Sequence, residues 1–312
     1  MRLRIDLAIL LCAMGPIAAG AVERLTLQTP LGREVEFIAR NFEPGEVVLA
    51  RLTRAPGTKR TVVRFLDQDF ELGNRENGRE PFAFIGLDLG IKPGDHVFKV
   101  SILGEDGRVE NLRQEFRLAA RDFPVKKLWV KEEYVTPPPE VEERIRWEAE
   151  LLETIYGLMI PRWMGDGNFI LPHDGKMASN FGERRVYNNI PRSTHSGVDI
   201  SAPFGEPVRA ANSGRVAVAR DLYFSGQTVI LDHGLGLFTY YCHFSRLRVK
   251  RGDPVEKGDV IGLVGSTGRS TGPHLHWGAK ILQSRVDPLA LLNLWFPEPR
   301  PQVNNEFILA QK

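Results

Sequence analysis

Cysteine is nearly missing from this chain, which has two cysteines among its 312 residues. Cys12 lies in the N-terminal stretch that we interpret below as a signal peptide, which leaves Cys242 as the single cysteine of the exported chain. One cysteine cannot form an internal disulfide, so the exported protein must rely on its hydrophobic cores or on a metal. A closed structural zinc site, which favours cysteine ligands, is not expected either.

The chain also lacks a strong charge bias and a long hydrophobic run. Its 41 basic and 39 acidic residues give a net charge of +2, which predicts no nucleic-acid partner. Its longest apolar stretch lies within MRLRIDLAILLCAMGPIAAGA, where a basic start precedes an apolar middle and a small-residue end. This pattern predicts a signal peptide over residues 1–21 and export to the periplasm, the cell envelope or the medium. An uncleaved N-terminal anchor is the alternative.

The remaining chain is predicted to be mainly β, in two domains joined by a helix. Short apolar runs separated by Pro-Gly and Asp-Gly turns predict an immunoglobulin-like β-sandwich over residues 22–130. The prolines of YVTPPPE and a helical spacing of apolar residues predict a linker and helix over 131–160. Residues 161–298 again show strands broken by Gly and Asp, and the tail 299–312 carries no recognisable chemistry.

Two histidines in the stretch TGPHLHWGAK stand two residues apart. Side chains alternate between faces along a strand, so His274 and His276 are expected on one face, with Leu275 and Trp277 pointing the other way into a core. An imidazole pair on one face suits a metal, proton transfer or both. An HxH by itself is more often a pair of surface histidines, so the pair needs further residues.

Two other segments carry further residues that could bind a metal or transfer protons. His195 and Asp199 in THSGVDISAP have an even spacing that places both on one side of an extended segment. In TYYCHFSRL, Tyr241 and His243 are expected on one face and Cys242 on the other. A catalytic zinc takes three protein ligands and a water, so these four histidines and one aspartate supply more than enough ligands and leave histidines over for acid–base chemistry. No HExxH motif is present.

Together the segments HSGVD, YYCHFSRL and GSTGRSTGPHLHWG resemble the M23 family of zinc metallopeptidases, the lysostaphin-like or LytM-type peptidoglycan endopeptidases. The resemblance extends over roughly residues 170–293 and includes GKMASNFGERR and RVDPLALL. It implies an antiparallel-β peptidase domain over 161–298 that hydrolyses peptide cross-links or bridges of peptidoglycan.

The resemblance also implies a role for each residue. His195, Asp199 and His276 would bind one Zn²⁺ per chain, whereas His274 and His243 would be the catalytic acid–base groups. We further expect Asn180 and Tyr241 to line the substrate groove.

Three other functions stay open at this point. A non-catalytic relative could bind or activate another wall hydrolase, although such a protein would be expected to lose ligands. A cysteine peptidase using Cys242 and His243 would need a bulge, because adjacent strand residues point to opposite faces. An adhesion module is the third alternative, and only the N-terminal sandwich supports it.

If the chain is a peptidase, we expect the N-terminal sandwich to cover the substrate groove or to dock on an envelope protein.

Overall fold

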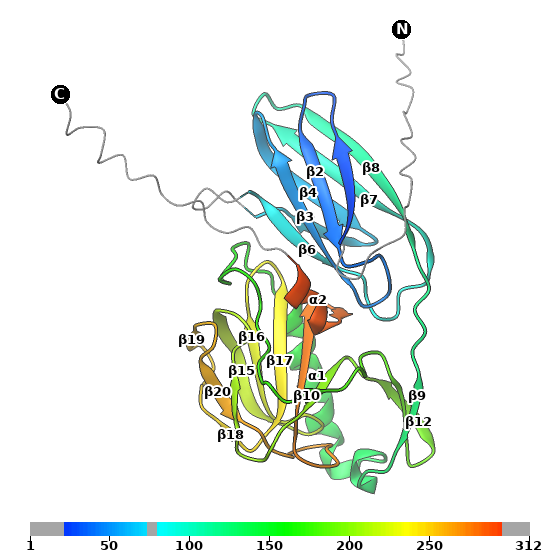
Figure 1. Cartoon of the computed structure of the whole chain (residues 1–312), viewed down its shortest axis with the longest axis vertical. Coiled ribbons are helices and arrows are strands. Elements are labelled where there is room, and N and C mark those ends of the chain that lie inside the picture. Colours follow the sequence, from blue (N-terminus) through cyan, green and yellow to red (C-terminus); the bar gives the residue numbers. More distant parts are fainter. Residues whose placement is uncertain (1–21, 74–79, 295–312) are drawn as a thin grey trace, which may run out of the picture.

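The computed structural model describes residues 22–73 and 80–294, so the predicted signal peptide and the tail 299–312 lie outside the described residues. Two β-rich bodies lie end to end, with a long helix beside the second one (Figure 1). The predicted mainly-β fold class is confirmed, because strands dominate both bodies. In the described part of the chain, neither helix combines the length and the apolar character needed to cross a membrane.

The first body is a sandwich of two antiparallel sheets. Its core lies between them and includes stacked aromatic rings, with the centroids of Phe37 and Phe98 4.5 Å apart. One sheet has the order β1 (Glu23–Gln28), β2 (Glu34–Ala39), β3 (Val47–Arg54), β6 (Phe82–Gly86). The other has the order β5 (Gln68–Glu71), β4 (Thr58–Phe65), β7 (Gly94–Gly104), β8 (Val109–Leu118).

The second body is built on one large antiparallel sheet. Its strands follow the order β10 (Lys176–Met177), β13 (Gly197–Ser201), β21 (His274–Ile281), β17 (Leu237–Phe244), β16 (Gly226–Asp232), β15 (Gly214–Leu222), β19 (Pro254–Val255), and β22 (Ser284–Val286) pairs with β21. A small sheet of β14 (Pro207–Arg209), β20 (Val260–Leu263) and β18 (Arg246–Leu247) completes this body. Leu275 and Trp277 are fully buried, as expected from the alternation along β21.

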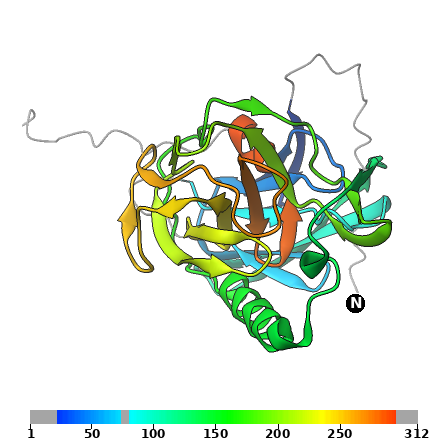
Figure 2. The same cartoon turned by 90° about the horizontal axis from the view of Figure 1, so that it is seen from below.

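The connection between the bodies runs along the second one. Strand β9 (Val125–Leu128) pairs in parallel with β11 (Arg184–Tyr187), whose hairpin partner is β12 (Ile190–Thr194). A 3₁₀ turn, η2 (Glu132–Tyr134), then leads to α1 (Pro139–Gly157), which begins with a proline as expected. Seen from below, α1 lies along the large sheet (Figure 2).

Helix α1 covers only part of the sheet face. Ile155 and Tyr156 pack on a separate apolar cluster that includes Phe238, Tyr240 and Cys242. This cluster draws on β15, β16 and β17 and includes no residue of β13 or β21, so polar side chains occupy the same face on those two strands.

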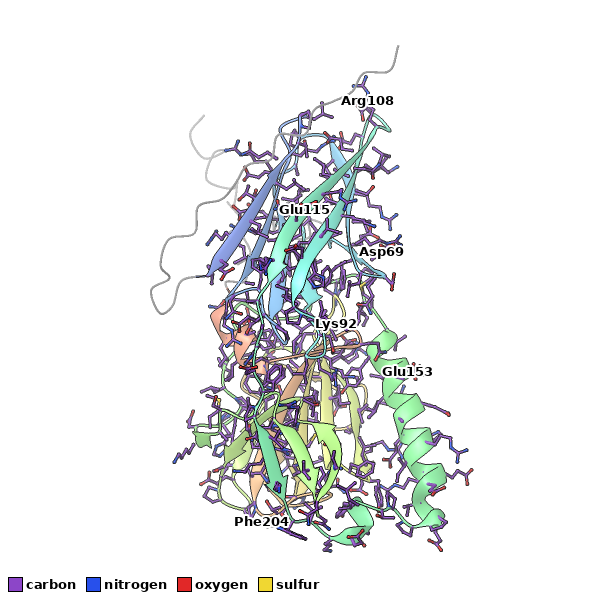
Figure 3. All side chains as sticks on the ribbon, turned by 90° about the vertical axis from the view of Figure 1, so that its right-hand side faces the viewer. Asp69, Lys92, Arg108, Glu115, Glu153 and Phe204 are labelled. Atoms are coloured by element: carbon purple, nitrogen blue, oxygen red, sulfur yellow. The ribbon has the colours of Figure 1, made fainter. Side chains whose placement is uncertain are left out.

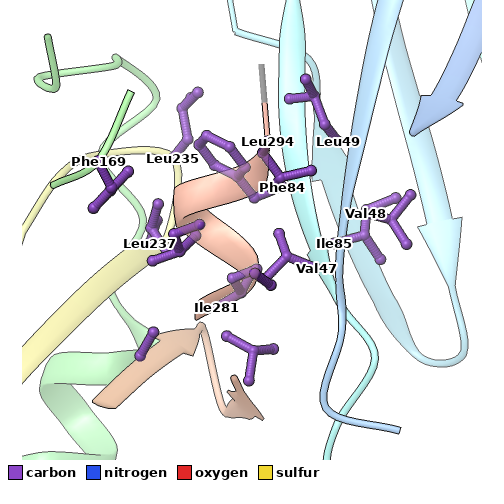
Figure 4. Packing of buried hydrophobic residues seen from close by; sticks show 14 of the residues in the cluster. Val47, Val48, Leu49, Phe84, Ile85, Phe169, Leu235, Leu237, Ile281 and Leu294 are labelled. Carbon is purple, nitrogen blue, oxygen red and sulfur yellow. The ribbon is translucent and has the colours of Figure 1, made fainter. Parts of the chain in front are cut away.

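The two bodies share one hydrophobic core. The short helix α2 (Pro288–Asn293) sits at the joint, and Leu294 beyond it lies near Phe84 of the sandwich (Figure 4). Leu237 and Ile281 of the large sheet belong to the same buried cluster as Val47 and Phe84. The joint therefore removes apolar surface of both bodies from water, which favours a fixed arrangement.

A buried charge network reinforces this joint. Asp287 accepts a hydrogen bond from the backbone N–H of Leu289 and so caps α2, and its carboxylate lies 2.9 Å from Arg40 of the sandwich. Arg40 and Arg121 also contact Glu46, whose side chain is 2% exposed. Two arginines and two carboxylates thus neutralise one another at the joint.

We expect Asp287→Ala to lower the free energy of unfolding by roughly 3–5 kcal/mol, because it leaves two largely buried arginines with Glu46 as their one carboxylate partner at the joint. Urea unfolding followed by tryptophan fluorescence measures this change. Asp69→Ala, which removes the exposed partner of Arg64, is the control and should change stability little. A small effect of Asp287→Ala would contradict a tightly coupled joint.

Candidate metal and catalytic site

Three side chains converge at the middle of β13 and β21. Asp199 pairs directly with His276 across these strands, and His195 precedes β13 by two residues. The His195 Nε2 atom lies 2.8 Å from His276 Nδ1 and 3.1 Å from Asp199 Oδ1, and His276 Nδ1 lies 2.9 Å from the same oxygen. Two ring nitrogens and one carboxylate oxygen therefore point at a common spot.

The second oxygen of Asp199 is held by two other residues. Asn180 Nδ2 and Arg185 Nη2 each donate to Asp199 Oδ2 at 2.8 Å. Asn180 Oδ1 also accepts from the backbone N–H of Asp199 at 3.1 Å. These contacts turn Oδ1 toward the histidines and fix the carboxylate in one orientation.

The position of Asn180 differs from the one expected. Its side chain is buried, with 8% exposed, and both of its polar atoms bond to Asp199. In this structure Asn180 therefore orients Asp199 and does not line an open groove. Arg185, on β11, also contacts Asp199, which the sequence did not lead us to expect. No periodic pattern marks it, because its contact depends on how the β11–β12 hairpin folds over β13.

The protonation states suit cation binding. Burial acts to raise the pKa of Asp199, but its close contacts with the His195 and His276 rings outweigh it and hold the pKa far below its usual value. Burial lowers the pKa of His276 to about 4, so its ring is neutral at pH 7. His195 Nδ1 donates to the carbonyl oxygen of Asn180 at 2.8 Å, which leaves Nε2 as the free lone pair. Neutral imidazole and ionised carboxylate are the forms that bind metals.

A β-bulge brings His243 to the same place. Tyr241 pairs with Val229 and Phe244 with Gln227, so Thr228 alone faces both Cys242 and His243. His243 adopts a positive φ of 65°. This extra residue reverses the alternation and turns His243 to the face that carries His274 and His276, with ring centroids 4.8 and 6.0 Å away.

The structure corrects two expectations about this strand. His243 and Tyr241 do not share a face, and Tyr241 is fully buried in the core. Its hydroxyl accepts from the backbone N–H of Ala211 at 2.9 Å, so it does not line a groove in this structure. The sequence TYYCHF carries no glycine or proline that would have announced the bulge.

His274 and His243 lie beside the convergent ligand atoms, and each ring forms a hydrogen bond to a backbone carbonyl. Nδ1 of His274 donates to the carbonyl of Gly272 at 2.8 Å, and Nδ1 of His243 donates to the carbonyl of Thr267 at 2.8 Å. Since a carbonyl can only accept, both rings carry their proton on Nδ1 and keep Nε2 as a base. His274 Nε2 lies 3.7 Å from Asp199 Oδ1, and burial with the neighbouring histidines lowers the pKa of His243 to about 3.

The donor set fits a small cation. His195, Asp199 and His276 each offer one ligand atom, and these atoms lie within 4.8 Å of one another in the part of the chain that the structure describes. Tetrahedral bonds of about 2.0–2.1 Å place two ligand atoms about 3.3 Å apart, close to the separations found here. A metal could therefore be held with little movement of these side chains.

Comparison with known proteins identifies the relationship. Residues 193–288 match peptidase family M23. A crystal structure from Pseudomonas aeruginosa, described as a peptidase M23, is 30% identical; the match covers 81% of this chain and 96% of that one, with a TM-score of 0.62. The chain belongs to peptidase family M23. The expected family resemblance is confirmed.

Curated M23 relatives match the second body more locally. The peptidoglycan DD-endopeptidase ShyA of Vibrio cholerae is 41% identical over 109 residues, which are 34% of this chain and 25% of the relative. The DD-carboxypeptidase/endopeptidase Mpg of Neisseria meningitidis is 40% identical over 119 residues, 38% of this chain and 27% of the relative. The matched part of the chain thus spans about a quarter of the length of these relatives.

Cys242 lies in a setting unlike that of a nucleophile. Burial raises the pKa of its thiol to about 12, and its side chain is 4% exposed. The bulge that a cysteine peptidase would need is present, but a thiol protonated at neutral pH is a poor nucleophile.

We expect Cys242 to resist iodoacetamide at pH 8 in the folded protein and to react fully in 6 M guanidinium. Peptide mass mapping measures the label at this residue. The denatured sample is the control for reagent quality, and rapid labelling of the native thiol would reopen the cysteine-peptidase interpretation.

Proposed function

We propose that this protein is a zinc-dependent endopeptidase that hydrolyses peptide cross-links or bridges of peptidoglycan. The observation that carries the proposal is the convergence of His195, Asp199 and His276 on one spot, with His243 and His274 beside it. Membership of family M23 and the names of its curated relatives support peptidoglycan as the substrate class.

In this proposal His195 Nε2, His276 Nδ1 and Asp199 Oδ1 would hold one Zn²⁺ ion. Bound zinc would supply Lewis-acid activation of a water molecule and of the scissile carbonyl. Asn180 and Arg185 keep Asp199 in a single orientation through Oδ2, so Oδ1 remains available as a ligand atom.

His274 and His243 would handle the protons. Each has its Nε2 lone pair free because Nδ1–H is bound to a backbone carbonyl. One ring can accept the proton of the attacking water, and a protonated ring can then deliver it to the leaving amine. A protonated ring also stabilises negative charge that develops on the carbonyl oxygen.

The non-catalytic alternative is less well supported. A protein that only binds another hydrolase would not need two histidines with their Nε2 atoms kept free next to three convergent ligand atoms.

We also propose export to the cell envelope, on the basis of the N-terminal sequence pattern and the location of peptidoglycan. Docking of the sandwich on an envelope protein stays a prediction.

Digestion of purified murein by the zinc-loaded protein, followed by mass analysis of the released fragments, tests the proposal. Peptide-bond cleavage that stops with a chelator and returns with zinc is the expected result. Intact murein after prolonged incubation of a fully zinc-loaded sample would contradict it.

Single replacement of His195, Asp199 or His276 by Ala should remove stoichiometric zinc and turnover together, because each supplies one of three protein ligands. The loss of zinc affinity should exceed the ~10–100-fold expected for an outer-shell partner. Metal analysis after dialysis and murein turnover are the measurements. His96→Ala in the sandwich is the control and should keep both, whereas a ligand variant with full zinc content would disprove the assignment.

His274→Ala should keep its zinc and lose about 10²–10⁴-fold in turnover, since it removes a proton-transfer group and no ligand. The same two measurements separate it from the ligand variants. Loss of the metal from this variant would place His274 among the ligands.

A further inference from the structure

A hollow of about 550 Å³ lies between helix α1 and the large sheet. Leu152, Glu153 and Tyr156 line it from the helix, and Tyr240, Cys242 and Lys280 line it from the sheet. Figure 3 shows α1 standing beside the second body, with Glu153 labelled on it. The hollow is thus bounded on one side by a helix that precedes the matched peptidase region.

One end of the hollow lies next to the candidate metal site. Ser196, which follows His195, is part of its lining, and its carbonyl accepts from the hydroxyl of Tyr240 at 2.8 Å. The Tyr240 ring lies 5.7 Å from the His276 ring. It also packs against Gly278, where an added Cβ would come within 2.1 Å of the ring. A chain bound at the metal site could therefore continue over Tyr240 into the hollow.

Lys280 lies farther along the same strand. It is four residues beyond His276 on the same face of β21, or about 13 Å along the strand. Its Nζ atom lies 4.3 Å from the centroid of the Tyr156 ring. Aromatic contact holds the ammonium group at the wall of the hollow without neutralising its charge.

The charge of Lys280 has no direct counter-ion within the described residues. The nearby carboxylate of Asp88 is occupied by Arg285 through contacts of 2.7 and 3.1 Å. Glu153 lines the same hollow, but no salt bridge within 4.0 Å joins it to Lys280. A half-buried cation in this position is available to an anionic group of a ligand.

We propose that the hollow is a subsite for the substrate peptide and that Lys280 binds a carboxylate of that peptide. The inference rests on the proposed peptidase function and extends it to substrate selection. An extended peptide advances about 3.3–3.6 Å per residue, so the carboxylate lies about three to four residues from the cleaved bond. Helix α1 is then a wall of the substrate groove.

The test compares two forms of one substrate, cross-linked muropeptide dimers with free carboxylates and the same dimers converted to carboxamides. The zinc-loaded full chain is assayed on both by chromatography. A hydrogen bond to a charged group is worth enough for about a tenfold change, so amidation should raise KM about tenfold, with kcat little changed.

Substitutions at Lys280 assign the effect. Lys280→Met should raise KM for the free-carboxylate form about tenfold and remove the difference between the two forms, whereas Lys280→Arg should keep it. Lys250→Met, at an exposed lysine of the same body, is the matched control and should behave like the wild type. Zinc content and the unfolding midpoint of each variant show whether the site and fold are intact.

Equal KM values for the two forms with the wild type would overturn the inference, and this comparison needs no variant. So would a Lys280→Met effect that is the same on both forms, because that pattern indicates only a packing role. Failure of the wild type to cleave either form would instead contradict the proposed function, and the inference with it.

Discussion

The pairing of β13 with β21 is the constraint on which the site depends. Their register sets Asp199 opposite His276, so two of the three convergent atoms come from neighbouring positions of one rigid sheet. A shift of one residue would turn His276 into the core and bring Trp277 to the surface. Burial of Leu275 and Trp277 on the other face opposes such a shift, and the hydrophobic core thereby fixes the geometry of the polar site.

Most of the other site features position side chains on that face. The bulge in β17 turns His243 to the site, and two backbone carbonyls hold His243 and His274 with Nε2 free. Arg185 reaches Asp199 from the β11–β12 hairpin, which is extended by β9 from the connection between the bodies. The segment that joins the two bodies thus also braces the hairpin that orients a proposed metal ligand.

The sandwich lies at the other end of β21. This strand begins with His274 at the site and ends with Ile281 in the core shared with the sandwich. The sandwich therefore does not lie over His274 in this arrangement, and α1 is the element that stands beside the groove. Buried charges and apolar contacts join the sandwich to the sheet at that end.

The sequence by itself determined the family, the mainly-β class and the residues that converge. Even spacing within HSGVD and HLH is a local property, and alternation along a strand turns it directly into a shared face. Tertiary structure decided the rest. The bulge at Cys242–His243, the burial of Tyr241 and Asn180, and the contact of Arg185 with Asp199 depend on residues distant in the chain. Lys280 could have been noticed on the His274–His276 face, but only the packing of α1 shows that this face continues into a hollow.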